Sequence, residues 1–363
     1  MISNVGHGKR ILFCINTPAQ AYFWQGVIKD LMRKGHNIKI LARDSGLTTN
    51  ILSSNGLDYS ILNTFKSKQV RLLSIINHLY KGYGLSKRFD PITIIGFGVA
   101  EALTSALAGK PSIIFTDSEP MFAQTFLTKL FASVIVTPNC FTKNLGSKHI
   151  RIDGYKELAY LHPNYFKPDP TIYDELKLNH NEKYVLLRFS SFEALHDSGK
   201  HGFSIEDKEE LVNKLEKNAT VFISAERGLP NNLQRYKLPT QPNKIHHVLY
   251  YAQMVVGDSQ TTTTEAAVLG TPAIRCNSFV GPNDMGNFIE LEQKYNLIFS
   301  LSDPDQAIQK AVQLIQQTDI KEQWAEKRQK LLADKIDVTK FMIDIIENFP
   351  NSVAKYRRKN GSL

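Results

Sequence analysis

The sequence predicts an α/β protein of two similar domains, each built around a parallel β-sheet. Two observations support this fold. Short apolar segments alternate with segments of helical periodicity through most of the chain, and the alternation lapses once, near the middle, before it restarts. The length of 363 residues also suits two domains of ordinary size.

The first half of the chain follows this alternation closely. Residues 10–15 (RILFCI) form an apolar segment of strand length, and residues 21–34 carry apolar side chains at helical spacing before Gly35. Further strands are predicted at 37–41, 59–62, 91–95, 111–115, 133–136 and 149–152, and further helices at 69–86, 100–108 and from Pro120. Strands that alternate with helices pair in parallel, so residues 1–165 are predicted to form the first domain.

The alternation lapses after residue 152 in a segment rich in tyrosine, proline and polar residues, which predicts a linker near 153–180. It restarts with the strand 183–188 and continues to about residue 335, which predicts the second domain over 180–335. The strands expected there are 220–224, 254–256, 272–275 and 297–299, and the helices are 205–217, 262–269, 283–294, 304–316 and 320–333. A separate helix follows within 336–350, and residues 351–363 form a basic tail.

The charge of the chain favours anionic partners. Lys and Arg number 44 against 35 Asp and Glu, which gives a formal net charge of +9. No nucleic-acid-binding motif accompanies the excess, so nucleic acid is not an expected partner. No apolar segment is long enough to span a bilayer and the N-terminus has no secretory pattern, which favours the cytoplasm. Contact of the basic segment 355–359 with the inner face of the cytoplasmic membrane and a simply solvated basic face remain alternatives.

The segment 255–275 (VVGDSQTTTTEAAVLGTPAIR) is the most informative one. A buried strand ends at Gly257-Asp258-Ser259, and a helix opens within the hydroxyl-rich residues that follow. The N–H groups and macrodipole of a helix start suit a phosphate or diphosphate, and serine and threonine hydroxyls add donors. Glu265, one turn into the helix, can accept hydrogen bonds from ribose hydroxyls. An N-capped helix without a ligand is the alternative.

This segment resembles the donor-binding segment of GT-B glycosyltransferases in its pattern D-S-x-x-x-x-x-E-A-x-x-L-G-x-P-x-x-R. It is also similar to that of the non-hydrolysing UDP-N-acetylglucosamine 2-epimerases. The resemblance implies that Ser259, Thr261 and Thr262, after Asp258, hold the diphosphate and that Glu265 holds the ribose. Those families often have two glycines after the serine, whereas this chain has Gln260 and Thr261.

A wider resemblance covers nearly the whole chain. The blocks 16–44, 153–169 and 188–204 and the EAAVLGTP segment resemble an uncharacterised prokaryotic family, domain of unknown function three-five-four. That family is grouped with GT-B glycosyltransferases and is often found near polysaccharide genes. The resemblance implies two Rossmann-like domains that face each other across a cleft, with the helix in 336–350 packed back on the first domain.

Several polar residues of the first domain follow predicted strands, where parallel sheets bind their ligands. Asn16 and Gln20 are expected to bind acceptor hydroxyls, and a polar turn before a helix is the alternative. Gln20 stands where the resembled family frequently has histidine. Glu101, Asp117 and Glu119 follow two adjacent strands and are predicted to converge, one of them as a general base. Helix capping before Pro120 is the alternative for the last two. Gly96-Phe97-Gly98 lacks the third glycine of a dinucleotide fingerprint, so it is weak support for NAD.

In the second domain, Arg188 and Ser190 follow the first strand, and the corresponding GT-B loop contacts donor phosphates. His196 lies in the same loop, which in the epimerases carries a catalytic histidine. His196, Asp197 and His201 lack further ligands at a recognisable spacing, so neither a metal nor another cofactor is expected. The kinase, serine-hydrolase and metalloprotease motifs are absent from the sequence.

These residues predict a metal-independent glycosyltransferase that uses a nucleotide sugar, UDP-linked by resemblance, in surface-polysaccharide or glycolipid synthesis. Its partners would be the donor and a glycan or lipid-linked acceptor. A UDP-sugar 2-epimerase or hydrolase is the second hypothesis, and a non-catalytic sugar-nucleotide-binding module is the third.

Overall fold

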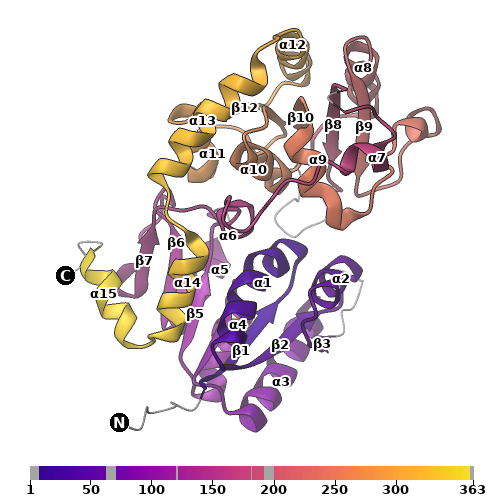
Figure 1. Cartoon of the computed structure of the whole chain (residues 1–363). Coiled ribbons are helices and arrows are strands. Elements are labelled where there is room, and N and C mark those ends of the chain that lie inside the picture. Colours follow the sequence, from indigo (N-terminus) through magenta and orange to yellow (C-terminus); the bar gives the residue numbers. More distant parts are fainter. Residues whose placement is uncertain (1–7, 63–70, 120–121, 181, 192–199, 360–363) are drawn as a thin grey trace, which may run out of the picture. The chain divides into compact units, whose positions relative to one another are not determined.

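The computed structural model describes residues 8–62, 71–119, 122–180, 182–191 and 200–359 of the chain. The chain divides into two compact units (Figure 1). Unit 1 is Met1–Tyr160 together with Ile336–Leu363, and unit 2 is Leu161–Lys335. Each unit contains one parallel sheet with helices, which confirms the predicted α/β fold.

Unit 1 has seven strands in the order β3-β2-β1-β4-β5-β6-β7. They are β1 (Arg10–Ile15), β2 (Asn37–Arg43), β3 (Ser60–Leu62), β4 (Thr93–Gly96), β5 (Ser112–Phe115), β6 (Val134–Pro138) and β7 (His149–Ile152). The order reverses between β1 and β4, and the carboxyl ends of strands at such a switch point are where open α/β sheets bind ligands. Residues 11–15 of β1 are fully buried, as expected for a parallel strand covered on both faces.

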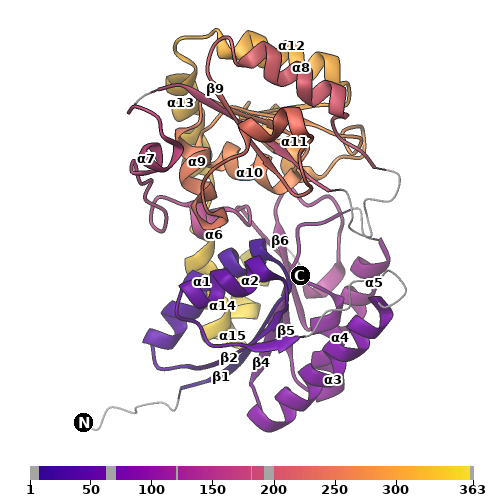
Figure 2. The same cartoon turned by 90° about the vertical axis from the view of Figure 1, so that its right-hand side faces the viewer.

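The helices of unit 1 form a layer on each face of this sheet (Figure 2). They are α1 (Pro18–Arg33), α2 (Gly46–Ser54), α3 (Arg71–Phe89), α4 (Val99–Ala108), α5 (Phe122–Phe131), the 3-10 helix η2 (Gly146–Lys148), α14 (Val338–Glu347) and α15 (Asn351–Lys359). One layer contains α1, α2 and α14, and the other contains α3, α4 and α5. Helix α1 begins three residues before the predicted start at Ala21, because Thr17 caps it and Pro18 occupies its first turn.

The C-terminal segment belongs to unit 1, as predicted for the returning helix. Helix α14 packs against α1, and the Thr339 hydroxyl donates a hydrogen bond to the Ala159 carbonyl (2.7 Å). The residues expected as a basic tail continue as helix α15. The Tyr356 ring packs on Phe341, and its hydroxyl donates a hydrogen bond to Asp344 (2.5 Å), which ties α15 to α14.

Unit 2 has five strands in the order β12-β11-β10-β8-β9. They are β8 (Tyr184–Phe189), β9 (Thr220–Ala225), β10 (Met254–Gly257), β11 (Ala273–Cys276) and β12 (Ile298–Leu301). The α-helices are α7 (Ile172–Leu176), α8 (Ile205–Leu215), α9 (Ile245–Tyr251), α10 (Gln260–Leu269), α11 (Gly286–Gln293), α12 (Pro304–Ile315) and α13 (Ile320–Asp334), and the 3-10 helices are η4 (Asn231–Tyr236) and η5 (Pro242–Lys244). The order reverses between β8 and β10, so β8 and β10 correspond to β1 and β4 of unit 1.

The segment predicted as a linker contains short helices. Helix α6 (Leu158–Leu161) lies at the division between the units and α7 lies within unit 2. Between them, the Phe166 ring packs on His247, 5.1 Å between ring centroids, and His247 Nδ1 accepts a hydrogen bond from Asp169 N. Burial lowers the pKa of His247, which suits a neutral imidazole in this acceptor role.

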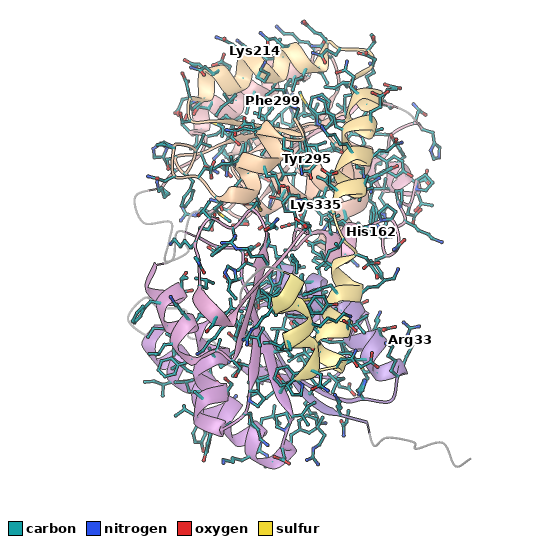
Figure 3. All side chains as sticks on the ribbon, turned by 90° about the vertical axis from the view of Figure 1, so that its left-hand side faces the viewer. Arg33, His162, Lys214, Tyr295, Phe299 and Lys335 are labelled. Atoms are coloured by element: carbon teal, nitrogen blue, oxygen red, sulfur yellow. The ribbon has the colours of Figure 1, made fainter. Side chains whose placement is uncertain are left out.

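Unit 2 ends at a buried lysine. Lys335 Nζ lies 2.8 Å from a Glu290 carboxylate oxygen and 5.5 Å from the centre of the Tyr295 ring (Figure 3). The ion pair and the ring contact offset part of the desolvation cost of burying this charge. In the part of the chain that the structure describes, no helix has the length and apolar content needed to span a bilayer.

Candidate functional site

The structure brings three predicted residues together at the switch point of unit 1. Asn16 Nδ2 donates a hydrogen bond to Glu101 Oε1 (2.5 Å), and the Gly98 backbone N–H donates one to Glu101 Oε2 (2.9 Å). Gln20 Oε1 in turn accepts a hydrogen bond from the Asn16 backbone N–H (2.7 Å). Glu101 is only 1% exposed. The Glu101 carboxylate therefore caps the N-terminus of α4 and, through Asn16, connects this helix to the end of β1.

The glycines of Gly96-Phe97-Gly98 have a different role from that of a phosphate-binding fingerprint. A Cβ atom at Gly96 would lie 2.3 Å from Glu101 Cγ, and one at Gly98 would lie 3.3 Å from Glu101 Oε2. Any larger residue at Gly96 would displace the Glu101 side chain. These glycines make room for a buried carboxylate.

His78 is a neighbour of this cluster that sequence reasoning missed. Its Nε2 atom lies 3.7 Å from Glu101 Oε1, is buried and has no hydrogen-bond partner among the residues that the structure describes. Burial lowers the pKa of His78; the Glu101 carboxylate opposes this shift, and Arg43 adds to it. The sequence holds no local signal for the pair, because His78 belongs to α3 and Glu101 to α4.

The other two predicted carboxylates of unit 1 contact different elements. Asp117 Oδ2 forms an ion pair with Lys156 Nζ (2.7 Å), and both side chains are largely buried. Glu119 Oε1 accepts a hydrogen bond from the Thr142 backbone N–H (2.6 Å), which fastens the segment after β6. Asp117 thus has a lysine partner, while Glu119 bonds to the backbone of a neighbouring loop.

Asp258 occupies the equivalent switch point in unit 2 and is 2% exposed. Its Oδ1 accepts a hydrogen bond from the Ser190 backbone N–H (2.6 Å), and a Cβ atom at Gly202 would lie 2.2 Å from its Oδ2. Asn277 Nδ2 donates to the Asp258 carbonyl (2.9 Å). Asp258 therefore fixes the residues on both sides of the segment 192–199, which lies outside the described residues together with His196.

Burial raises the pKa of Asp258 to about 6, although the hydrogen bond from Ser190 N and the positive charge of Lys208 act in the opposite direction. Near neutral pH the group is therefore close to its titration range. Perturbed carboxyls of this kind are often found in functional sites.

Helix α10 begins directly after Asp258. Ser259 is its N-cap, and the Ser259 hydroxyl contacts the Thr262 hydroxyl (3.2 Å) and lies 3.5 Å from the Thr262 backbone nitrogen. The first N–H groups of an α-helix have no partner within the helix. Thr261 and Thr262 contribute to this first turn, so predicted phosphate ligands Ser259, Thr261 and Thr262 are placed together.

The Glu265 carboxylate lies one turn further along α10 and is nearly buried. Its Oε1 atom lies 3.0 Å from His246 Nε2, on helix α9. The Phe166 ring packs edge-on against His246, 6.3 Å between ring centroids. His246 therefore orients the carboxylate predicted to bind ribose, and it is a second site residue that the sequence did not indicate.

Arg188 and Ser190 lie at the end of β8, on either side of its last residue. Arg188 Nη2 forms an ion pair with Glu226 Oε1 (2.8 Å), and its Nη1 donates a hydrogen bond to the Ser224 hydroxyl (3.0 Å). The Arg188 side chain is one-fifth exposed and that of Glu226 is nearly half exposed. The guanidinium is thus held by Ser224 of β9 and by Glu226, which follows that strand, and Ser190 contacts Asp258 through its backbone.

Arg275, which ends the donor-segment pattern, has a structural role. It is fully buried, forms an ion pair with Asp284, and lies over the Phe288 ring at 3.6 Å from the ring centre. These contacts attach strand β11 to the loop that follows it and to α11. Within the described ranges, no group of three or more His, Cys, Asp or Glu side chains is arranged to hold a metal ion.

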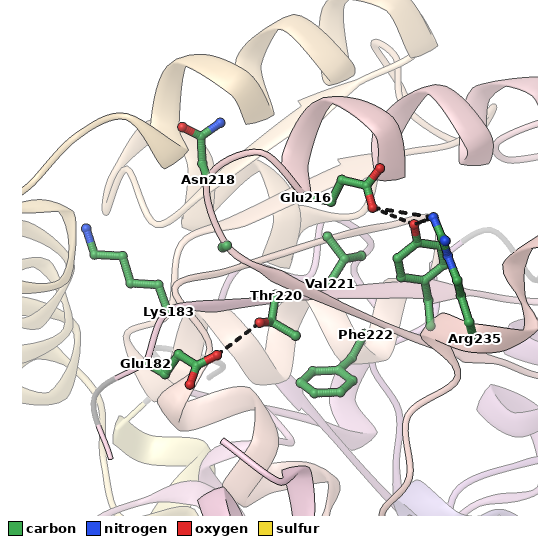
Figure 4. A pocket seen from close by; sticks show the side chains of 10 residues that line it. Glu182, Lys183, Glu216, Asn218, Thr220, Val221, Phe222 and Arg235 are labelled. Carbon is green, nitrogen blue, oxygen red and sulfur yellow. Dashed lines mark hydrogen bonds and ion pairs between the residues drawn. The ribbon is translucent and has the colours of Figure 1, made fainter. Parts of the chain in front are cut away.

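A separate pocket of about 580 Å³ lies at the amino ends of β8 and β9. Glu216 contacts Tyr236 and Arg235 along its wall, and Thr220 donates a hydrogen bond to Glu182 (3.3 Å) (Figure 4). The pocket is at the opposite end of the sheet from Asp258 and α10, so it does not belong to the predicted site.

These features define the class of fold. The S. aureus MnaA–UDP co-structure is similar to this chain, with a TM-score of 0.68, 13% identity, and coverage of 94% of this chain and 97% of that one. A putative UDP-N-acetylglucosamine 2-epimerase from Listeria monocytogenes has a TM-score of 0.68, 12% identity and coverage of 94% and 96%. Acinetobacter baumannii MurG has a TM-score of 0.58, 16% identity and coverage of 94% and 100%. The fold is the GT-B type with Rossmann-like domains, as predicted.

The chain belongs to the family described as "Protein of unknown function (DUF354)", whose model matches residues 11–350. This match confirms the resemblance drawn from the sequence blocks. No curated protein matches the sequence.

Proposed function

We propose that this protein is a glycosyltransferase that takes its sugar from a nucleotide-sugar donor. The observation that carries the proposal is the start of α10, where Ser259 and Thr262 hydroxyls surround the first turn beside buried Asp258. A helix start without an acidic side chain in its first turn is suited to bind a diphosphate.

The donor contacts follow from this placement. The first-turn N–H groups and the Ser259, Thr261 and Thr262 hydroxyls bind the diphosphate. Glu265, oriented by His246, accepts hydrogen bonds from the ribose hydroxyls. Arg188 exchanges part of its pairing with Glu226 for the diphosphate and stabilises the charge that develops as the diphosphate leaves.

The base that activates the acceptor is assigned to unit 1. Asp117 is the best candidate, because Glu101 and Glu119 accept hydrogen bonds from backbone N–H groups, whereas Asp117 pairs with a side chain, Lys156, which can turn away when the acceptor binds. The carboxylate takes the proton of the acceptor hydroxyl, and the hydroxyl oxygen attacks the anomeric carbon. The bond from that carbon to the diphosphate breaks, and its electron pair stays on the diphosphate.

The acceptor class is proposed from the family resemblance. Genes of similar proteins often lie near polysaccharide genes, which favours a glycan or lipid-linked acceptor in surface-polysaccharide or glycolipid synthesis. The donor nucleotide is proposed to be UDP, because structures named as UDP complexes and UDP-N-acetylglucosamine 2-epimerases share this fold.

A UDP-sugar 2-epimerase or hydrolase is the second candidate. The structures named as epimerases have TM-scores up to 0.68, against 0.61 for the glycotransferase of kitacinnamycin and 0.58 for MurG, which favours this candidate. It would use His196, which lies outside the described residues, together with the unit 1 carboxylates. A binding module without catalysis is the third.

Incubation of the full chain with UDP-sugars separates these functions. Transfer of labelled sugar that requires an added glycan or glycolipid acceptor supports the glycosyltransferase. Interconversion or hydrolysis of UDP-N-acetylglucosamine without acceptor supports the second candidate and rejects the first. Binding of UDP with no product from a panel of acceptors supports the binding module.

A further inference from the structure

Three neighbouring helices of unit 1 carry most of the large apolar side chains that are exposed in the described part of the chain. Of fourteen such side chains, eight belong to α3, α4 and α5. They are Ile75, Ile76, Tyr80 and Tyr83 of α3, Leu107 of α4, and Phe126, Leu127 and Leu130 of α5. Single exposed apolar residues are ordinary, but a group on adjoining helices indicates an interaction surface.

These side chains share one face. Helix α4 packs between α3 and α5, and the sheet covers the inner side of this layer (Figure 2). The contact of α3 with α4 is close, because a Cβ atom at Gly82 would lie 2.8 Å from Thr104 Cγ2. The exposed side chains therefore project from the outer side of the layer, which we name the outer face of α3–α5.

The outer face is also cationic. Helices α3 and α5 contain no acidic residue, and the single acid of α4 is the buried Glu101. Lys87, Arg88 and Lys129 are exposed on the same helices. Lys87 Nζ lies 5.4 Å from the centre of the Tyr83 ring, so a cation and an aromatic side chain are adjacent. The nearest following acid, Asp90, forms ion pairs with Arg10 and Lys110.

We propose that the outer face of α3–α5 binds an anionic lipid bilayer. Exposed tyrosines, leucines and phenylalanine beside lysine and arginine are the side chains that insert at the boundary of headgroups and acyl chains. The absence of exposed acids from these helices matches a negative surface. A symmetric contact between two copies would instead place cations against cations, which disfavours a dimer through this face.

The C-terminal basic segment fits this role less well. Lys355 is already paired with Asp344 at 3.1 Å, and Tyr356 is packed on Phe341. The outer face therefore replaces the segment 355–359 as the main membrane contact. Membrane binding by this face does not depend on which reaction the protein catalyses.

Sedimentation of the full chain with vesicles tests the proposal. The vesicles contain phosphatidylcholine with about one third phosphatidylglycerol, or phosphatidylcholine alone, at low and high salt. The test variant carries Tyr80→Ser, Leu107→Ser and Leu130→Ser, whose side chains are 78%, 59% and 57% exposed. The matched control carries Met32→Ser, Leu47→Ser and Ile61→Ser, which are exposed elsewhere in unit 1. Thermal unfolding and circular dichroism verify that both variants fold.

We expect the wild-type chain to bind the anionic vesicles at low salt and the control to bind equally. The test variant should bind about tenfold or more weakly, because three apolar side chains no longer insert. A Lys87→Gln, Arg88→Gln, Lys129→Gln variant should lose binding to anionic vesicles and show a smaller salt dependence. Equal binding of wild type and test variant, or no binding by wild type, would overturn the proposal. A dimer in light scattering that the test variant abolishes would overturn it in favour of a contact between copies.

Discussion

Helix α4 of unit 1 and helix α10 of unit 2 each follow the strand next to the switch point of their sheet. The N-termini of these two helices are capped differently. In α4 the third residue after the N-cap is Glu101, whose carboxylate accepts the hydrogen bond of Gly98 N and is buried. In α10 the same position is Thr262, beside the capping Ser259. The first helix neutralises its own positive end, whereas the second presents hydroxyls to it. We infer that unit 2, and not unit 1, binds an anionic ligand at its helix start.

The largest effect is expected from removing the carboxylate of unit 1. Glu101→Ala leaves the Asn16 amide and the Gly98 N–H without their acceptor, and should lower the free energy of unfolding of unit 1 by about 3–5 kcal/mol. Glu101→Gln keeps one acceptor oxygen and should lower the free energy of unfolding by a smaller amount. The chain has two tryptophans, and Trp24 lies in unit 1, so its fluorescence in a Trp324→Phe background reports this unit. If the Glu101→Ala variant is as stable as the wild type but has no activity, Glu101 takes part in the reaction and does not stabilise the fold.

The next effect concerns the buried acid of unit 2. The pKa of Asp258 is raised from 3.8 to about 6, so the folded state binds more protons than the unfolded state between these values. This group should therefore lower the stability of unit 2 as the pH rises from about 4 to 6, by up to about 3 kcal/mol in total. Asp258→Asn keeps an oxygen for Ser190 N and should remove this decrease. Denaturation monitored at Trp324 in a Trp24→Phe background, over this pH range, checks it. Parallel curves of the free energy of unfolding against pH for the wild type and Asp258→Asn would contradict the expectation.

A third substitution transfers the unit 1 arrangement into unit 2. In helix α8, Asp207 at the corresponding position accepts a hydrogen bond from Ser204 N (2.7 Å), so an aspartate can close a serine-capped helix. Thr262→Asp should do the same in α10 and weaken UDP binding by about 2–3 kcal/mol, because its charge repels the diphosphate. Thr262→Asn is the uncharged control and should lose about 1 kcal/mol or less. Equal losses of UDP affinity for both variants in calorimetry would indicate that the start of α10 does not bind an anion.

Glu265→Ala tests the ribose contact. It should weaken UDP binding by about 1–3 kcal/mol, since ribose hydroxyls lose a charged acceptor. His246→Gln should have a smaller effect, because it only loosens the orientation of Glu265. Glu210→Ala, on the exposed side of α8, is the control for a lost negative charge. Unchanged affinity of Glu265→Ala for UDP would remove this residue from the donor site.

The smallest effect is expected at the ion pair of Arg188. Glu226 is nearly half exposed, so its pairing with Arg188 contributes little. Glu226→Gln should release the guanidinium for the diphosphate and strengthen UDP binding by less than about 1 kcal/mol. Arg188→Lys should weaken it. An unchanged affinity in both variants would indicate that Arg188 only supports β9.

Most of the fold could be predicted because strand and helix patterns are local. The limits of β1 and β7 agree with the predicted segments residue for residue, and the helix at 338–348 appears as α14. Helix α2 was not predicted, since its serines and threonines favour other local hydrogen bonds and its amphipathic pattern is short. The last helix, α15, was expected as a tail because its residues are mostly polar and charged. This helix is held in place by the hydrogen bond between Tyr356 and Asp344. These two residues belong to different helices, so the contact is not visible in a local pattern.

The partners of the site residues could not be predicted in the same way. The glutamates at 101 and 265 were singled out, but their histidine neighbours lie 23 and 19 positions away on other helices, without any local motif. The three strand-end carboxylates of unit 1 also have the same expected role when only the sequence is considered. Only the contacts distinguish Asp117, paired with Lys156, from Glu101 and Glu119, which hold backbone N–H groups.

A crystal structure of the chain with UDP tests the central inference most directly. We predict a diphosphate within hydrogen-bond distance of the Ser259 and Thr262 hydroxyls and the first N–H groups of α10, with the ribose against Glu265. UDP bound at the amino ends of β8 and β9, in the pocket lined by Glu182 and Arg235, would contradict this assignment. Full occupancy by UDP with the start of α10 left free of phosphate would contradict it equally.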